Sequence, residues 1–177
     1  MILFRHADPR LPFLWENADQ PRARWHGEGE GPVQYFADTP DGAWAEFIRH
    51  EGITGEAELM NVRRALWAVD VSGDWRAESP GLARQVLTGG IASYEACRKE
   101  ARRLRRRGAT ALRAPSAALL DGGATGWKVD GGLRPAPKRD GIVFAFFGPR
   151  QDFVGWMAVF AGQPRSDLLA RVRPLEF

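Results

Sequence analysis

The sequence predicts an α+β fold in a single domain that covers residues 1–177, with a mixed, mostly antiparallel sheet and flanking helices. The length of 177 residues suits one domain, and 44% hydrophobic with 27% charged residues is typical of a globular protein with one core. Segments with strand character alternate with helical segments early in the chain and follow one another near its end. This mixed order does not fit a regular parallel sheet.

The first predicted elements are a strand at residues 33–37 (VQYFA) and a helix over residues 40–50. Thr39 can cap this helix, and Pro40 suits its first position. Its apolar stripe consists of Ala43, Trp44, Phe47 and Ile48. Glu46 falls at the border of the stripe, where a side chain can point into a cleft instead of bulk water.

The later elements follow from similar local patterns. We expect strands at 64–71 and 109–114, a short helix from Ser79-Pro80 to Gly89, and an amphipathic helix over 91–107 with Ile91, Tyr94, Cys97, Ala101 and Leu104 as its apolar stripe. Residues 121–141, rich in glycine and proline, predict a long loop. Residues 141–148 and 152–160 are predicted to pair as a hairpin, and residues 168–177 to form a terminal strand.

Composition narrows the class of protein. The single cysteine, Cys97, excludes an intramolecular disulfide and a multi-cysteine zinc site, which fits a reducing cytoplasm. No apolar stretch approaches the roughly 18 residues of a membrane helix, and Arg5 comes too early for a signal peptide. We therefore expect a soluble cytoplasmic protein without membrane association.

The net charge of +3 comes from one segment. Residues 98–107 hold seven basic residues and one acidic residue, so the rest of the chain is mildly acidic. We expect Arg98, Arg102, Arg105 and Arg106 to form the solvated face of this basic helix, and docking of an acidic protein segment is the functional alternative. Direct nucleic-acid binding is not favoured, because no aromatic residues interleave with these charges.

Several common catalytic motifs are absent. The segment 27–31 (GEGEG) lacks the spacing and the strand–helix setting of a dinucleotide fingerprint, and 122–128 (GGATGWK) lacks the Lys-Ser/Thr of a P-loop. The histidines show no metal-ligand spacing, and no G-x-S-x-G elbow occurs. Bound metal, ATP and serine-esterase chemistries are therefore not indicated.

An ordered set of short motifs is present instead. It consists of Arg24-Trp25, the run Gly31-Pro32-Val33-Gln34-Tyr35-Phe36-Ala37-Asp38, Ala43 with Glu46, and Pro115-Ser116-Ala117. In order and spacing, across about residues 20–120, this set resembles the RES domain family. The resemblance implies a fold related to mono-ADP-ribosyltransferases, a toxin activity that degrades NAD, and a helix-turn-helix (Xre-type) antitoxin as partner.

The chemistry of NAD cleavage agrees with these residue types. Breaking the nicotinamide–ribose bond leaves positive charge on the sugar, which a fixed carboxylate such as Glu46 stabilises where water is excluded. Arg24 is the natural clamp for a pyrophosphate or amide. Tyr35 can stack on a ring or donate a hydrogen bond, and Ser116 can reach a carboxamide or phosphate oxygen. NAD is then the substrate, inorganic phosphate a second substrate if it replaces water as acceptor, and no cofactor is needed.

The chain departs from the family pattern at several positions. His26 stands where a small polar residue such as asparagine is usual after Arg-Trp, and Arg5 matches an early family arginine only by position. Ser93, near the start of the predicted helix, is a second candidate for the functional serine, beside Ser116.

Each residue also has an ordinary structural role that the sequence leaves open. Arg24 could stack on a tryptophan at the surface, Glu46 could pair with a neighbour on its helix, Tyr35 could belong to the core, and Ser116 could cap a turn.

Two other functions stay open. One is transfer of ADP-ribose to a protein target, and the other is a non-enzymatic binding module that uses the basic helix 98–107.

Overall fold

The computed structural model describes residues 1–177 and confirms the α+β class with a mixed, mostly antiparallel sheet. The main sheet has seven strands in the order β4-β5-β8-β2-β1-β3-β9, and only β4 and β5 pair in parallel. The strands are β1 (Ile2–Ala7), β2 (Val33–Ala37), β3 (Arg64–Asp70), β4 (Ala77–Glu78), β5 (Ala111–Pro115), β8 (Ile142–Phe147) and β9 (Val154–Gly162).

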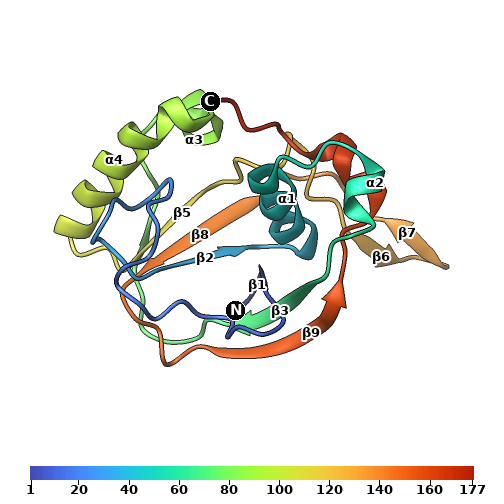
Figure 1. The fold of residues 1–177 in the computed structure, drawn as a ribbon, viewed down its shortest axis with the longest axis horizontal. Coiled ribbons are helices and arrows are strands. Elements are labelled where there is room, and N and C mark those ends of the chain that lie inside the picture. The colour runs from blue at the N-terminus through green and yellow to red at the C-terminus, as the bar shows by residue number, and fades with distance from the viewer.

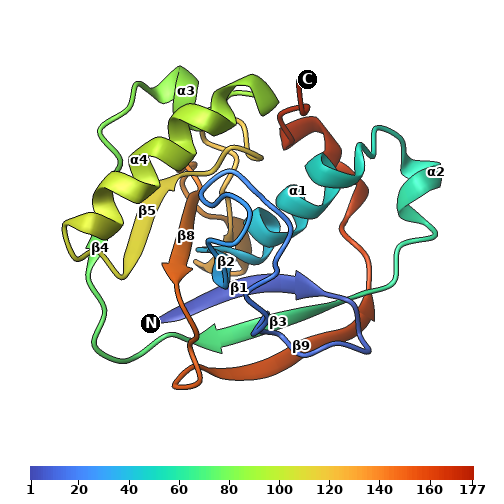
Figure 2. The same ribbon diagram turned by 60° about the vertical axis from the view of Figure 1, so that its left-hand side comes forward.

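The sheet is split in its middle. Strands β1 and β2 pair at a single position, Phe4 opposite Ala37, whereas β1 pairs with β3 along its whole length and β2 pairs with β8 along its whole length. Two half-sheets result, β1-β3-β9 and β2-β8-β5-β4, and Figure 2 shows the strands of the first running across those of the second. The diverging strands leave a wedge between the half-sheets.

Helices cover the sheet on the side of this wedge. They are α1 (Pro40–Glu51), α2 (Glu56–Leu59), α3 (Arg84–Thr88), the 3-10 turn η1 (Ile91–Ser93), α4 (Tyr94–Arg106) and the 3-10 helix η2 (Ser166–Arg171). Helices α3 and α4 lie over β5, and α1 lies over β1 and β2 (Figure 1). None of the helices combines the length and apolar character needed to cross a membrane.

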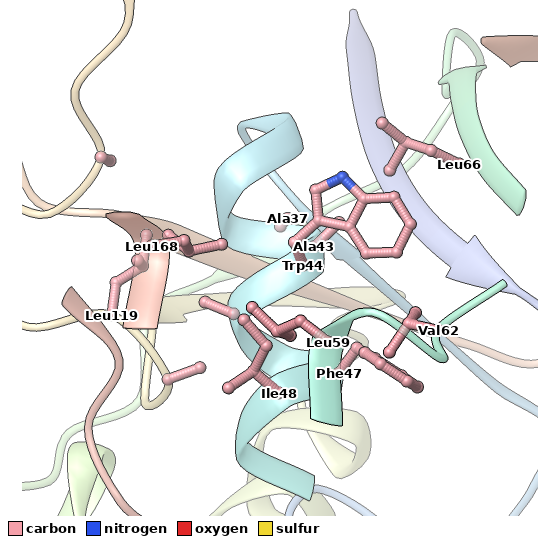
Figure 3. Close-up of a cluster of buried hydrophobic side chains, with 13 residues drawn as sticks. Ala37, Ala43, Trp44, Phe47, Ile48, Leu59, Val62, Leu66, Leu119 and Leu168 are labelled. Atoms are coloured by element: carbon pink, nitrogen blue, oxygen red, sulfur yellow. The ribbon is translucent and has the colours of Figure 1, made fainter. Parts of the chain in front are cut away.

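Helix α1 begins and ends as its sequence predicts. The Thr39 side chain accepts a hydrogen bond from the Gly42 N–H at 3.0 Å, and Gly52 ends the helix in the left-handed conformation with φ 66°. The predicted apolar stripe is buried in one cluster with α2, β3 and η2. Figure 3 shows Trp44 directed toward Leu66 and Leu168 on the other side of the helix. Packing on several sides fixes the rotation of α1 and hence the direction of Glu46.

Two further clusters complete the core. Four of the five predicted stripe residues of the second helix, Tyr94, Cys97, Ala101 and Leu104, are buried on α4, while Ile91 lies in η1 and is exposed. The last three of these pack against β2, β5 and β8. The opposite face of the split sheet is covered by aromatic residues, with Phe146 at their centre.

Several sequence-based predictions about individual elements were wrong. Strands β8 and β9 do not pair as a hairpin, because β8 lies between β2 and β5 while β9 is the edge strand beside β3. Residues 121–141 contain a small hairpin, β6 (Trp127–Val129) with β7 (Leu133–Pro135). Residues 168–177 form no strand, because the chain turns into η2 to bury Leu168 beneath α1.

The helix predicted from Ser79-Pro80 is α3, which starts only at Arg84. The Gly81 N–H donates instead to the Glu100 carboxylate of α4 at 2.7 Å, which keeps this segment out of the helix. Strand β1 was not predicted, because residues 2–7 show no clear strand pattern in the sequence. Its place in the sheet comes from its pairing with β3.

Candidate active site

A cavity of about 590 Å³ fills the wedge where β1 and β2 diverge. Its walls come mainly from β1, β2 and α1 and from residues of the connecting segment 8–25. Of the residues predicted from the sequence, five line it: Arg5, Arg24, Trp25, Tyr35 and Glu46. The other three, His26, Ser93 and Ser116, lie behind this first layer and contact its members.

Glu46 projects from α1 into the cavity with its side chain 25% exposed. Its Oε1 accepts a hydrogen bond from the Ser116 hydroxyl at 3.3 Å, and its Oε2 lies 3.7 Å from Nε2 of His50. The carboxylate is therefore held from two sides while one edge still faces the cavity. Glu46 therefore both lies beside His50 on its own helix and faces the cavity.

Ser116 orients Glu46 and does not contact the cavity. It is 4% exposed, and its Oγ also accepts the N–H groups of Ala118 and Leu119 at 3.2 and 3.1 Å, so it caps the turn after β5. Its only hydroxyl proton goes to Glu46. In this structure the Ser116 hydroxyl is committed to Glu46, and direct contact with a ligand carboxamide or phosphate stays a prediction.

Arg24 is buried and is held by the segment before α4. Its Nη2 donates to the Gly89 carbonyl at 2.6 Å, its Nη1 donates to Ser93 Oγ at 3.0 Å, and its guanidinium stacks on the Tyr94 ring at 4.5 Å. Cys97 lies 3.8 Å from the same Nη1, and burial raises the pKa of its thiol. Ser93 thus fixes the arginine, and the stacking partner is Tyr94 in place of a surface tryptophan.

Arg49 is a member of the site that the sequence reasoning missed. It is 3% exposed, lines the cavity, and donates from Nη2 to the same Gly89 carbonyl at 2.8 Å. Its buried Nε has no hydrogen-bond partner, and burial lowers its pKa. Its position three residues after Glu46 on the same helix face was the signal that could have identified it.

Tyr35 is linked to His26 and Trp25 through its hydroxyl. The Pro21 carbonyl can only accept, so His26 Nε2 donates to it at 2.9 Å. Because burial lowers the pKa of His26 and keeps its ring neutral, Nδ1 accepts the Tyr35 hydroxyl proton at 2.9 Å. The same hydroxyl accepts the Trp25 backbone N–H at 3.1 Å. Tyr35 offers the cavity its ring, and donation from its hydroxyl to a ligand stays a prediction.

Arg5 extends from β1 to Gln34 of β2, which in turn contacts segment 8–25. Its Nη1 donates to Gln34 Oε1 at 2.9 Å, and burial lowers its pKa to about 10. Gln34 also accepts the Trp15 backbone N–H at 2.9 Å, and its amide donates to the Trp15 carbonyl. Arg5 and Gln34 therefore connect segment 8–25, through Trp15, to strands β1 and β2.

The cavity carries an excess of unneutralised positive charge. Arg5, Arg24, Arg49 and Arg64 all line it, and none has a carboxylate within 4.0 Å, unlike the paired arginines at the surface. Guanidinium groups without an acidic partner suit phosphate or carboxylate groups of a ligand. Aromatic walls from Trp15, Trp25, Tyr35 and Tyr94 suit flat rings. No group of three or more His, Cys, Asp or Glu side chains could hold a metal ion.

The basic helix, α4, contributes less free surface than its sequence predicted. Arg102 pairs with Glu30 at 3.1 Å and with Glu95 at 2.8 Å, while Arg105 donates to the Glu30 carbonyl at 3.1 Å and lies over Phe147. Arg98, 15% exposed, donates to Glu95 and to the carbonyl before Arg24. Of the four arginines expected on a solvated face, only Arg106 is exposed. The others hold the loop that carries Arg24.

Comparison with known proteins identifies the family. A family model described as the RES domain matches residues 3–126. Among solved structures, the chain is similar to one in the crystal structure of the M. tuberculosis MbcT-MbcA toxin-antitoxin complex, with a TM-score of 0.61 and 14% identity over 96% of this chain and 86% of that chain. A search of curated proteins finds no match. Because the family model spans well over half of the sequence, the chain belongs to the RES domain family.

Proposed function

We propose that this protein is the toxin of a toxin–antitoxin pair and that it cleaves the nicotinamide–ribose bond of NAD. One observation carries the proposal: Glu46 presents a held carboxylate to a cavity lined by four arginines that have no acidic partner. Three carboxylates, Asp8, Glu16 and Glu46, also line the cavity, and Asp8 is paired with Arg10. A cavity that combines the Glu46 carboxylate with four arginines lacking an acidic partner matches a ligand that combines a diphosphate with a positively charged ring. NAD has both features.

The reaction needs few protein groups. As the bond from the ribose to nicotinamide breaks, the electron pair leaves with the nicotinamide nitrogen and positive charge develops on the sugar ring. Glu46, fixed by Ser116 and facing an apolar-walled cavity, stabilises that charge or binds the ribose hydroxyls. Water then gives ADP-ribose and one proton, whereas inorganic phosphate gives ADP-ribose carrying a new phosphate.

Arg24 and Arg49 hold the ligand in different ways in this proposal. Three of the Arg24 hydrogen-bond partners are protein atoms of residues 86–93, so its main task is to shape the cavity wall. Arg49 donates to the protein only through Nη2, which leaves Nη1 for a phosphate and makes Arg49 the better direct ligand.

The proposed partner is an antitoxin with a helix-turn-helix domain of Xre type. One solved structure with a similar fold is that of a toxin-antitoxin complex. A toxin that consumes NAD acts in the cytoplasm, where a bound antitoxin keeps it silent until release. Neither a cofactor nor a membrane takes part in this scheme.

The test is a product assay with purified protein. NAD would be incubated with and without inorganic phosphate, and nicotinamide and ADP-ribose products would be followed by mass spectrometry. Glu46→Gln should lower nicotinamide release by at least about 100-fold, since one preorganised electrostatic group is worth on the order of 10²–10³ in rate. Glu51→Gln is the matched control, because Glu51 is exposed on the same helix and does not line the cavity.

The product mass identifies the acceptor. A mass increase on an added protein, in place of free ADP-ribose, would indicate transfer to a protein target. Full activity in a folded Glu46→Gln variant would remove Glu46 from the proposed role. The absence of nicotinamide release by wild type under all these conditions would refute NAD cleavage.

A further inference from the structure

His6 occupies a corner of the cavity that the proposed reaction has not used. It lies near the end of β1, lines the cavity, and packs edge-on against Phe47 of α1 with ring centroids 5.1 Å apart. Arg64, on the neighbouring strand β3, places Nη2 3.4 Å from His6 Nδ1. The guanidinium of Arg64 also lies over the Phe47 ring at 5.4 Å. Two strands and one helix thus fix the orientation of the imidazole.

The contact with Arg64 determines where the imidazole carries its proton. A guanidinium group can only donate, so Nδ1 of His6 must accept with its lone pair. A neutral imidazole then has its proton on Nε2. No protein atom accepts that proton, so the Nε2–H remains a free donor on a cavity-lining residue.

Burial, and then the charged groups around it, keep the His6 ring neutral. Arg64 on β3, Arg5 on β1 and His50 on α1 are its electrostatic neighbours, and all of them disfavour a second positive charge. Together with burial they lower the pKa of His6 to about 3. The ring is therefore an uncharged donor at neutral pH and cannot exchange protons as a general acid or base there.

We infer that His6 is a ligand-binding residue whose Nε2–H donates to an oxygen acceptor of NAD, and that Arg64 is a positioning residue that fixes the tautomer. The inference rests on the proposed function. His50 neighbours His6 and lies 3.7 Å from Glu46, which places His6 at the Glu46 end of the cavity. The acceptor is accordingly a ribose hydroxyl or an adjacent phosphate oxygen.

The pair has the features of a binding element more than those of a packing contact. Buried donors in native proteins nearly always have partners, yet the buried Nε of Arg64 has none. Arg64 also lacks any carboxylate within 4.0 Å, although it lines the cavity. A purely structural arginine at this depth would be expected to form an ion pair.

Nuclear magnetic resonance tests the inference on the full chain. The Glu46→Gln variant would be labelled with ¹⁵N-histidine, and its three histidines observed by long-range ¹⁵N–¹H correlation. We expect His6 to be the Nε2–H tautomer from pH 5 to 8 and its Nε2 signal to shift when NAD is added. If tryptophan signals of the cavity respond to NAD and His6 does not, the inference fails while the proposed substrate stands. If no cavity signal responds, the proposed substrate fails and the role of His6 fails with it.

Kinetics supplies the second measurement. His6→Gln keeps an N–H near the Nε2 position and should retain the KM for NAD within about threefold, whereas His6→Phe should raise the KM about tenfold with kcat little changed. Arg64→Met should raise the KM for NAD at neutral pH, because Nδ1 of His6 loses the donor that fixes the ring proton on Nε2, and Arg64→Lys should restore it. Equal kinetics for the Gln and Phe variants, or a wild-type KM for Arg64→Met, would overturn the assignment.

Discussion

The hydrogen-bond chain through Tyr35 gives a sharp prediction for Tyr35→Phe. The hydroxyl accepts the Trp25 N–H at 3.1 Å and donates to His26 Nδ1 at 2.9 Å, and both partners are almost completely buried. Removing the hydroxyl leaves one donor and one acceptor without partners, and each such group costs about 1–3 kcal/mol. Tyr35 lines the cavity, so a water molecule there can replace part of the loss. We expect the free energy of unfolding to fall by about 2–4 kcal/mol.

The assay is urea unfolding followed by fluorescence, with the thermal midpoint as a second measure. A loss of this size should lower the Tm by at least about 5 °C in a chain of this length. Tyr94→Phe is the matched control, because the Tyr94 ring stacks with Arg24 while its hydroxyl forms no hydrogen bond within the protein. That variant should change stability by less than about 1 kcal/mol.

Enzyme kinetics distinguish a Tyr35 hydroxyl that only holds Trp25 and His26 from one that donates to the ligand. Since both hydrogen-bonding positions of the hydroxyl are in use, folded Tyr35→Phe should keep kcat and the KM for NAD within about threefold of wild type. Wild-type stability combined with a large rise in KM would mean that the hydroxyl contacts the ligand, and the reasoning would be refuted.

Three further variants test the remaining features of the site. Ser116→Ala should lower kcat about tenfold with KM unchanged, because Glu46 loses the hydrogen bond that orients it; unchanged steady-state kinetics in a folded variant would contradict this. Arg24→Lys should cost about 2 kcal/mol in urea unfolding, because an ammonium group cannot reproduce the fork to Gly89 and Ser93; equal midpoints would argue against it. The pKa of His6 is lower in the folded protein than its ordinary 6.5, so wild type should be most stable above pH 6.5 and lose up to about 1.4 kcal/mol per pH unit below it. His6→Gln should remove the His6 contribution to the fall in the free energy of unfolding between pH 6 and 5. Urea denaturation at these two pH values measures it, and an equal fall in wild type and variant would contradict the prediction.

Local rules predicted α1 well because its signals act over a few residues. The Thr39 cap and Pro40 specify the start, and the spacing of apolar residues specifies the buried face. Glu46 at the border of that face follows from the same geometry. The position of the catalytic candidate along its helix was thus available from sequence.

Strand pairing was less predictable because it joins distant residues. Because only a short connection joins β8 and β9, the sequence predicted that these two strands pair as a hairpin. Five of the six residues of β8 are buried, so it needs a strand on each edge and a packed layer on each face, and it takes β2 and β5. Strand β9 is exposed along most of its length and stays at the sheet edge beside β3.

By itself the sequence determined the fold class, the family and five of the residues that line the candidate site. The order of Arg24, Tyr35, Glu46 and Ser116 carried the family resemblance, and helix geometry placed Glu46 at the edge of an apolar face. These properties depend on residue type and on spacing along the chain, which sequence records directly.

The tertiary structure alone decided which donors remain free for a ligand. Ser93 and Ser116 donate their hydroxyl protons to the Gly90 carbonyl and to Glu46, and Tyr35 donates its own to His26. In contrast, Nη1 of Arg49 and Nε2 of His6, two residues that line the cavity, have no acceptor within the protein. Two of these three acceptors, Glu46 and His26, are side chains that lie more than eight residues along the chain from their donors. A sequence specifies the side chains, but the allocation of their hydrogen bonds depends on which distant groups folding brings within about 3 Å.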